Sequence, residues 1–475
     1  MSENIREIVL DTLLTLEREE EFSNRLIKAV LDKYDYLSFQ EKSFIKRVAE
    51  GTIERQIELD YYLNHISSVP VRKMKPLIRC LLRMSAYQIL YMNAIPDSAA
   101  CNEACKLADK RKFHNLKGFV NAVLRKLTTE KEALPLPDRE KEPALFLSVK
   151  YSMPEWLVER WLFEYGSHIT ETLLEGLLQI HQVSLRFSMK LSEEEREKYL
   201  SAITEQKRAE GQNTVIRQST YLPYVYTVDN IDGIETLPGF SEGVFTVQDV
   251  SSALAVEAAG ISAGDFVVDV CAAPGGKSLL AAERAGRVLA RDVSEAKCAM
   301  IEENIERMKA DNVTVQVYDA TRQDGGLTEQ ADVVLLDVPC SGLGVIGKKR
   351  DIKYRVSEES LAEITALQRR IVENSWQYVK KGGILLYSTC TINRAENEDM
   401  VQWILDNFPF RAEPVWEYLP KRLLAERKRV CSLLANAGSD AVKQYLSGEV
   451  QEACVQLLPG YMEADGFFFA RLRRS

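Results

Sequence analysis

Two cysteines and an aspartate stand where the sequence predicts neighbouring strands to end. Asp337 and Cys340 follow the apolar run Val333–Leu336, and Cys390 follows the run Ile384–Tyr387. Turn-forming residues precede both cysteines, which places the thiols in loops rather than in a packed core. A thiolate can add to an electrophilic carbon, and a carboxyl group beside it can give or take a proton. The alternative for each cysteine alone is a small buried side chain without chemistry.

A glycine-rich turn follows an earlier apolar run, Phe266–Val270, and leads into a predicted helix. At such a turn a ligand can approach main-chain amides closely. The phosphate-binding P-loop does not fit, because Cys271 stands where its first glycine is needed, and the three spaced glycines of a dinucleotide site are also absent. The turn consists of Cys271, Ala272, Ala273, Pro274, Gly275, Gly276 and Lys277.

Aspartates follow the next two predicted strands, Arg287–Ala290 and Val313–Val317. Asp292 is placed to accept both ribose hydroxyls of a nucleoside. Asp319 could accept from an adenine amino group. Each acid alone is more simply a solvated strand end. Together with the glycine-rich turn, they favour a cofactor that contains adenosine but no pyrophosphate.

These strand ends belong to a region in which short apolar runs alternate with helices, beginning near residue 240. The alternation predicts a doubly wound, mostly parallel sheet. Ligands of such sheets bind at the carboxyl ends of the strands. The candidate residues should therefore lie along one edge of the sheet.

The rest of the chain divides into segments of different pattern. Residues 1–130 have apolar side chains three and four apart and few strand-like alternations, which predicts a helical domain. Within it, Asp97 and Ser98 offer a cap for one helix. A Pro-rich charged linker and a helix follow at 131–160, then a small α+β segment at 161–240 and the catalytic region at 241–475. Residues 420–455 form a helical insertion without an assigned function.

Charge is distributed unevenly along this acidic chain, whose formal net charge is −9. Residues 71–130 hold twelve Lys or Arg against four Asp or Glu. A solvated helix face and a binding surface for phosphates both explain this excess. The cations that we predict to contact RNA phosphates are Lys106, Lys110, Arg111, Lys112, Arg125, Lys348, Lys349, Arg350 and Lys353.

Three motifs resemble one enzyme family. Asp269–Lys277, Asp337–Gly342 and Tyr387–Thr391 are similar to motifs of the RNA cytosine-5 methyltransferases of the Nop2/Sun type. Gln248–Ser252 and Asp465–Phe468 support the match. In the N-terminal part, stretches such as Ile95-Pro96-Asp97 and Gly118–Arg125 resemble the helical RNA-binding domain of the antitermination factor NusB.

The resemblance implies a multidomain protein with an all-α NusB-like domain, a small α+β segment and a Rossmann-like α/β methyltransferase domain. It also implies S-adenosylmethionine as cofactor and small-subunit ribosomal RNA as substrate. Transfer RNA and a non-catalytic RNA-binding assembly factor are the alternatives. The cofactor would be surrounded by Cys271 to Lys277, Asp292, Asp319 and Asp337.

Carbon 5 of cytosine is a poor nucleophile, and a thiolate that adds to carbon 6 activates it. The resemblance implies that Cys390 is this nucleophile and that Cys340 assists release. Asp337 would reach the cytosine, and Lys277 is counted with the catalytic residues.

We expect a cytoplasmic monomer without a metal site. The acidic N-terminus lacks the pattern of a signal peptide, and no apolar stretch reaches the roughly 18 residues that span a bilayer. The nine cysteines are scattered, which suits free thiols in a reducing compartment.

Overall fold

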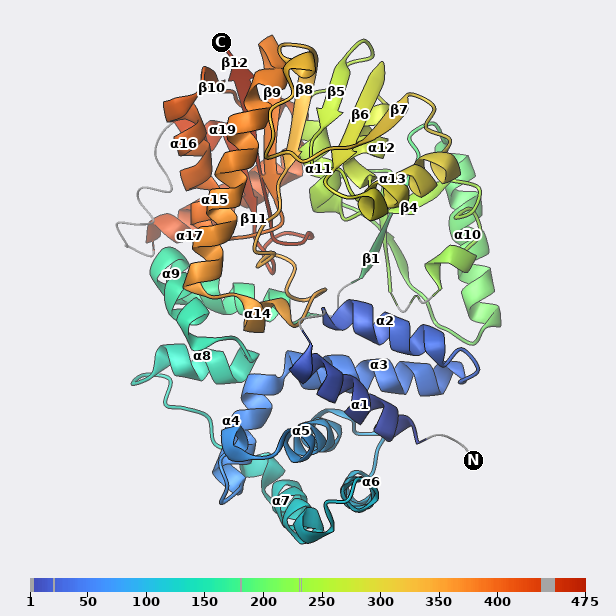
Figure 1. The fold of residues 1–475 in the computed structure, drawn as a ribbon, viewed down its shortest axis with the longest axis vertical. Coiled ribbons are helices and arrows are strands. Elements are labelled where there is room, and N and C mark those ends of the chain that lie inside the picture. Colours follow the sequence, from blue (N-terminus) through green and yellow to red (C-terminus); the bar gives the residue numbers. More distant parts are fainter. Residues whose placement is uncertain (1–3, 20–21, 180–181, 230, 232, 437–448) are drawn as a thin grey trace. The chain divides into compact units, whose positions relative to one another are not determined.

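The computed structural model describes residues 4–19, 22–179, 182–229, 231, 233–436 and 449–475 (Figure 1). It comprises two compact units. The first contains Met1–Leu174 together with Ile346–Arg355, and the second contains Glu175–Val345 and Val356–Ser475.

The first unit is helical, as the sequence predicts. Its core is built from apolar side chains spaced three and four apart, among them Leu10, Ile45, Leu59 and Leu124, which are fully buried. Its helices are α1 (Ile5–Arg18), α2 (Ser23–Lys33), α3 (Phe39–Glu54), α4 (Gln56–Ile66), α5 (Pro76–Tyr91), α6 (Asp97–Lys110), α7 (Lys117–Glu130), α8 (Pro143–Tyr151), the four-residue α14 (Ile352–Arg355) and most of α9 (Glu155–Leu177).

The cap predicted for α6 is wrong. The helix is preceded by Pro96, and Asp97 is its first residue, with no side-chain cap. The Asp97 carboxylate instead accepts from Lys131 Nζ at 2.8 Å, an ion pair that was not apparent from the local sequence.

The first unit extends beyond the Pro-rich linker expected at 131–160. Helix α8 packs against α4, so the chain after the linker returns to the N-terminal helices instead of starting a separate body. The segment Ile346–Arg355 also belongs to this unit, although it lies within the predicted catalytic region in sequence. The domain boundaries expected from the sequence, at residues 130, 160 and 240, remain predictions.

The second unit contains a small antiparallel sheet with strand order β2-β3-β1-β4. The strands are β1 (Val183–Phe187), β2 (Ile216–Gln218), β3 (Val225–Val228) and β4 (Phe245–Val247), with α10 (Glu193–Ala209) beside them. Leu185, Phe187 and Phe245 form the core of this layer together with Ile203 of α10. This is the α+β segment that the sequence predicts.

The large sheet of the second unit positions the candidate site. Its strand order is β10-β12-β9-β8-β5-β6-β7, and β11 pairs with β12. The five predicted runs are the parallel strands β5 (Phe266–Asp269), β6 (Arg287–Asp292), β7 (Val313–Val317), β8 (Ala331–Asp337) and β9 (Val379–Thr389). An antiparallel part was not predicted, and it consists of β10 (Phe410–Ala412), β11 (Cys454–Leu457) and β12 (Phe467–Arg474).

Helices cover this sheet (Figure 1). The core between the strands and α15 and α16 contains Val334, Leu385, Ile371 and Met400. The helices of this region are α11 (Val250–Ala258), α12 (Gly276–Ala282), α13 (Glu295–Met308), α15 (Glu358–Ser375), α16 (Glu398–Asn407), α17 (Lys421–Asn436) and α19 (Glu449–Ala453). The two last helices confirm helical structure in the predicted insertion, of which residues 437–448 lie outside the described residues.

Within the described part of the chain, no helix combines the length and apolar character needed to cross a bilayer.

Candidate active site

The two thiols singled out in the sequence lie side by side. Strands β8 and β9 are parallel neighbours whose register pairs Asp337 with Ser388, so the loops that follow them start at the same edge of the sheet. Cys340 Sγ lies 3.1 Å from Cys390 Sγ. Neither cysteine forms a disulfide, and both are partly accessible. Residues that are 50 positions apart in sequence thus form one reactive pair.

The surroundings of Cys340 oppose the ionisation of its thiol. The hydrogen bond with Cys390 and burial raise the pKa of Cys340 well above its usual value, and the charges of Glu396 and Asp337 act in the same direction. Two thiolates in van der Waals contact would repel each other. Cys340 is therefore the partner that keeps its proton and can donate it to the sulfur of Cys390.

Asp337 lies at the end of β8 and is held from two sides. Ser388 Oγ donates to its Oδ1 at 2.8 Å, and Lys277 Nζ forms an ion pair with its Oδ2 at 2.7 Å. The Lys277 ammonium also lies 5.1 Å from the centre of the Phe467 ring, a cation–π contact. Lys277 thereby connects the glycine-rich turn to the loop that carries Cys340.

The glycine-rich turn has a shape that only glycine allows. Gly275 has φ +100°, and a Cβ added there would lie 3.2 Å from Ile301 Cγ2. The Ala273–Pro274 peptide bond is cis. Asn304 Nδ2 of α13 donates to Pro274 O at 3.1 Å. The turn is thus fixed against α13 with its backbone at the carboxyl end of β5.

The two predicted cofactor aspartates follow neighbouring strands but differ in surroundings. Asp292 is buried and accepts from Ala273 N at 3.0 Å, so it holds the glycine-rich turn. Lys297 Nζ lies 3.0 Å from its other oxygen. Asp319 is more exposed, and hydrogen bonds from the side chain and backbone of Thr321 lower its pKa. Asp319 is therefore a carboxylate acceptor at the open edge of the sheet.

Sequence reasoning missed Asp269 as a titrating group. It ends β5 fully buried, and Ser278 Oγ donates to its Oδ2 at 2.6 Å, while Oδ1 has no hydrogen-bond partner. Burial raises the pKa of Asp269 to about 7, with the charges of Asp337 and Asp292 adding to the effect. The signal available in the sequence was an acidic residue, Asp269, at the end of an otherwise apolar strand.

Sequence reasoning also missed the side chains that hold the two thiol loops. Glu396, Asn397 and Gln368 are fully buried beside these loops. The polar residues shortly after Cys390 were the signal that could have pointed to Glu396 and Asn397.

The cations predicted to bind RNA in the helical domain are not equally available. Lys106 pairs with Glu103 at 2.8 Å, and Lys110 pairs with Glu7 at 2.6 Å. Arg111 contacts both Glu7 and Asp11. Lys112 and Arg125 are exposed and form no ion pair with any described residue.

The second predicted group of cations lies in the segment Ile346–Arg355 of the first unit. Lys349 is exposed and Lys348 half-buried, whereas Arg350 pairs with Glu50 and Glu54. Lys353 is buried, and its Nζ donates to Glu54 O at 2.7 Å and to Ser152 O at 2.5 Å. This placement argues against the RNA contact expected of Lys353.

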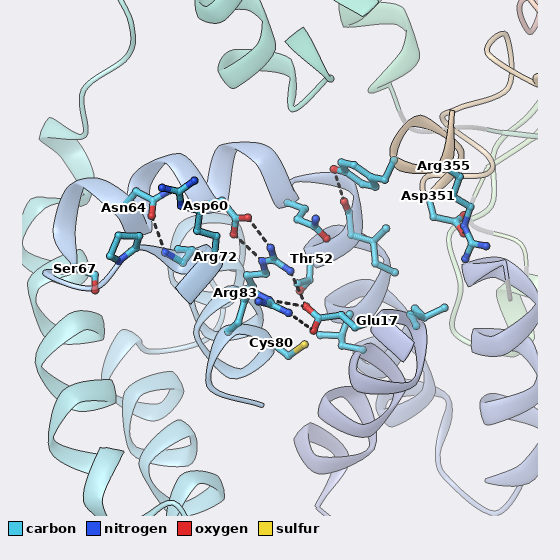
Figure 2. Close-up of a pocket in the computed structure, with 18 of the residues that line it drawn as sticks. Glu17, Thr52, Asp60, Asn64, Ser67, Arg72, Cys80, Arg83, Asp351 and Arg355 are labelled. Atoms are coloured by element: carbon cyan, nitrogen blue, oxygen red, sulfur yellow. Dashed lines mark hydrogen bonds and ion pairs between the residues drawn. The ribbon is translucent and has the colours of Figure 1, made fainter. Parts of the chain in front are cut away.

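The first unit also contains a cavity of about 870 Å³ (Figure 2). Figure 2 shows Arg83 reaching both Asp60 and Glu17. Arg83 donates to Asp60 Oδ2 at 2.6 Å and to Glu17 Oε1 at 3.0 Å, and Arg79 donates to Glu17 Oε2 at 2.7 Å. Four arginines and four acidic residues line the cavity. Because their charges cancel, they favour neither an anion nor a cation as ligand.

The fold and the site define a class of protein. The mixed sheet, with its glycine-rich turn after β5 and its aspartates after β6, β7 and β8, is that of an α/β methyltransferase. Residues 260–473 match the family model of the 16S rRNA methyltransferase RsmB/F, and residues 3–129 match the NusB family.

Two relatives show how far the similarity extends. The chain is 31% identical over 483 residues to the probable ribosomal RNA small subunit methyltransferase B of Bacillus subtilis, with 99% of each chain covered. It is 30% identical over 441 residues to ribosomal RNA small subunit methyltransferase B of Citrobacter koseri, covering 92% of this chain and 91% of that protein. The protein therefore belongs to the RsmB/F family of 16S rRNA methyltransferases, with an N-terminal NusB domain.

Solved structures agree in fold. The crystal structure of PH0851 superposes on this structure with a TM-score of 0.76 at 24% identity. The match covers 100% of this chain and 100% of that chain. A methyltransferase homologue from Pyrococcus horikoshii has a TM-score of 0.56 at 25% identity, covering 70% of this chain and 99% of that one.

Proposed function

We propose that the protein transfers a methyl group from S-adenosylmethionine to carbon 5 of a cytosine in small-subunit ribosomal RNA, through a covalent bond between Cys390 and carbon 6. The observation that carries the proposal is the 3.1 Å contact between the sulfurs of Cys340 and Cys390. A single thiol would serve addition alone, whereas a second thiol in contact with it provides for release.

The residues around the glycine-rich turn suit the proposed cofactor by their chemistry. The turn Cys271–Lys277 brings backbone close to the strand ends, and Asp319 offers a carboxylate acceptor beside it. Asp292 and Asp337 complete the set of acids, and Lys277, the basic residue of the turn, forms an ion pair with Asp337. When bound, S-adenosylmethionine supplies a methyl group on a positively charged sulfur.

In the attack step, the Cys390 thiolate forms a bond to carbon 6 of the cytosine. The electrons of the double bond between carbons 5 and 6 then make carbon 5 nucleophilic. Cys340 supports the thiolate before attack by donating its S–H. Asp337, fixed by Ser388 and Lys277, is the group that we assign to nitrogen 3 of the ring, where a carboxyl group hydrogen-bonds or delivers a proton.

In the release step, the proton on carbon 5 must leave so that the bond between Cys390 and carbon 6 can break. While Cys390 is bound to carbon 6, its sulfur carries no charge. The largest cause that raises the pKa of Cys340 is then removed, so Cys340 can lose its proton to solvent and accept the one from carbon 5. Cys390 departs as a thiolate, and the products are the methylated base, one proton and S-adenosylhomocysteine.

The test uses Cys390→Ala and Cys340→Ala with 16S rRNA from cells that lack the protein. Bisulfite sequencing reads the methylated cytosine, and a denaturing gel reads covalent enzyme–RNA complexes. We expect Cys390→Ala to give neither product nor complex, and Cys340→Ala to accumulate the complex. Normal methylation by Cys390→Ala would overturn the proposal. Bisulfite sequencing of total RNA from cells with and without the protein tests the substrate. Loss of a methylcytosine in transfer RNA instead of 16S rRNA would keep the chemistry and replace the substrate, and no loss in any RNA would favour a binding factor.

A further inference from the structure

The loop that carries Cys340 is held by the carboxylate of Glu396, the last residue of the short helical turn Arg394–Glu396. Glu396 Oε2 accepts from Ser341 N at 2.9 Å. It also accepts from Gln368 Nε2 at 2.9 Å, and the same Nε2 donates to Pro339 O at 2.9 Å. The backbone on both sides of Cys340 is thus fixed by one carboxylate and the amide bound to it.

The loop that carries Cys390 is held by Asn397, the next residue in the chain. Asn397 Oδ1 accepts from Thr389 Oγ1 at 2.6 Å, and Asn397 Nδ2 donates to Thr391 O at 3.0 Å. These two threonines flank Cys390. A further bond from Nδ2 to Gln456 Oε1 at 2.8 Å fixes the amide.

Burying Glu396 costs free energy, because its carboxylate loses contact with water. It is fully buried, and no lysine or arginine of the described chain forms an ion pair with it. A buried carboxylate without a cation depends on hydrogen bonds for its stability, and Glu396 Oε1 takes a further one from Asn393 Nδ2 at 2.8 Å. Its charge also acts on Cys340, whose pKa it helps to raise.

We propose that Glu396 and Asn397 are positioning residues with separate tasks: Glu396 sets the Cys340 loop for release of the product, and Asn397 sets the Cys390 loop for attack on carbon 6. This inference rests on the function proposed above, because it divides that reaction between the two loops. Neither residue touches the reacting atoms itself.

Two measurements separate attack from release. RNA that contains 5-azacytosine traps the adduct permanently, because the ring nitrogen at position 5 has no proton to lose, so the trapping rate reports attack alone. With ordinary 16S rRNA, the fraction of enzyme held covalently at steady state rises when release is slow. Melting temperature and S-adenosylmethionine binding check that each variant is folded.

Glu396→Gln keeps the volume but loses one acceptor, which leaves one of the three donors without a partner. We expect trapping within about twofold of the unmodified protein, and on the order of tenfold slower release with accumulation of the adduct. Because the nearby negative charge is gone, the pH profile of release should also shift to lower pH. A residue that served packing alone would not move that profile.

Asn397→Asp loses both Nδ2 donors, and Thr389→Val removes only the hydroxyl that binds Asn397. We expect trapping to fall on the order of tenfold in Asn397→Asp and less in Thr389→Val, with no accumulation of adduct in either. Asp399→Asn is the matched control: it removes an exposed carboxylate that binds Arg394 and should leave both measurements unchanged.

Equal losses of trapping and release in the Glu396 and Asn397 variants would overturn the division of tasks, and so would a Glu396→Gln variant with normal release. A failure of the proposed function would give a different result, because it would appear as trapping of 5-azacytosine RNA by Cys390→Ala. If Cys390→Ala still trapped 5-azacytosine RNA, the reaction itself would be misassigned.

Discussion

At the residue scale, Asp269 is an acid that lies fully buried. It has one hydrogen-bond donor, Ser278, and one oxygen without a partner. Burial raises the pKa of Asp269 to about 7, so near neutral pH a small change of pH alters its charge. Since Asp269 lies just before the glycine-rich turn, its charge bears on the stability of the strand end that holds that turn.

We predict that Asp269→Asn makes the protein less sensitive to pH. The folded state binds a proton from about pH 4, the ordinary value for aspartate, up to about pH 7, whereas the unfolded state does not. The free energy of unfolding should therefore fall as pH rises through this window, by up to about 1.4 kcal/mol per pH unit. Urea unfolding of both proteins at about pH 6 and pH 8 measures the difference, and parallel changes in the two proteins would contradict it.

At the element scale, the five parallel strands could be predicted because each is a short apolar run that ends in a polar residue. The contact of Cys340 with Cys390 followed in part, since loops after neighbouring strands meet at one edge. The sequence did not show which strands lie next to each other in the sheet. Strand β12 pairs Phe468 with Thr389, 79 positions away by their numbers, and no local pattern encodes such a pairing.

The burial of polar groups could not be predicted either. A lysine is expected at the protein surface, but Lys353 is buried. Its Nζ donates to the backbone carbonyls of Glu54 and Ser152, which are far from it in the sequence. Glu396 likewise receives its donors from residues up to 55 positions earlier, such as Ser341. Hydrogen bonds of this kind are decided by the folded arrangement, and the residue type alone indicates exposure.

The segment that carries Gly344 crosses another loop at contact distance. Gly344 N donates to Cys390 O at 3.1 Å, and Gly466 N donates to Gly344 O at 3.0 Å. A Cβ at residue 344 would lie 1.9 Å from Gly466 O, which is backbone and cannot move aside cheaply. The Cys390 loop therefore depends on the absence of a side chain at this crossing.

We predict that Gly344→Ala lowers the free energy of unfolding by about 2 kcal/mol or more and slows trapping of 5-azacytosine RNA, because the clash displaces the Cys390 loop. Gly264→Ala is the control, since a Cβ there meets no atom within 4 Å and should leave trapping unchanged. Urea unfolding and the trapping rate are measured on both variants. Normal trapping by Gly344→Ala would show that the crossing does not position Cys390.

The segment Ile346–Arg355 gives the first unit a group with pH-dependent charge. Burial lowers the pKa of Lys353 to about 7, below the ordinary lysine value of about 10.4. Between these values the unfolded state binds the proton and the folded state does not, so this group makes stability rise with pH from about 7 to 10.

We predict that Lys353→Met destabilises the protein and that its deficit grows with pH. The variant leaves Glu54 O and Ser152 O without the Nζ donor, at about 1–3 kcal/mol for each unsatisfied group, and it lacks the rise of stability above pH 7. Melting temperatures at about pH 7 and pH 9 test this. A deficit that stays constant between these two pH values would mean that Lys353 is charged in the folded protein throughout that range.

At the scale of the whole molecule, an acidic chain must bind a polyanion through local positive charge. The net charge is −9, and long-range attraction to RNA is therefore absent. In the helical unit, Lys106, Lys110 and Arg111 are paired with acids. Exposed cations that form no ion pair with described residues, such as Lys112 and Arg125, are the ones that can neutralise phosphates without first breaking an ion pair.

We predict that the double variant Lys112→Glu with Arg125→Glu weakens binding to 16S rRNA and reduces its salt dependence. For each phosphate that the protein no longer neutralises, the slope of log affinity against log salt should become shallower by about 0.7–0.9, so two such phosphates should change it by about twice that amount. The control is Lys190→Glu with Lys198→Glu, two exposed lysines of the second unit, which changes the net charge equally. If both double variants weakened binding to the same extent, net charge would control affinity. A shallower slope confined to the first would assign phosphate binding to the helical unit, and an unchanged slope in both would assign it to other cations.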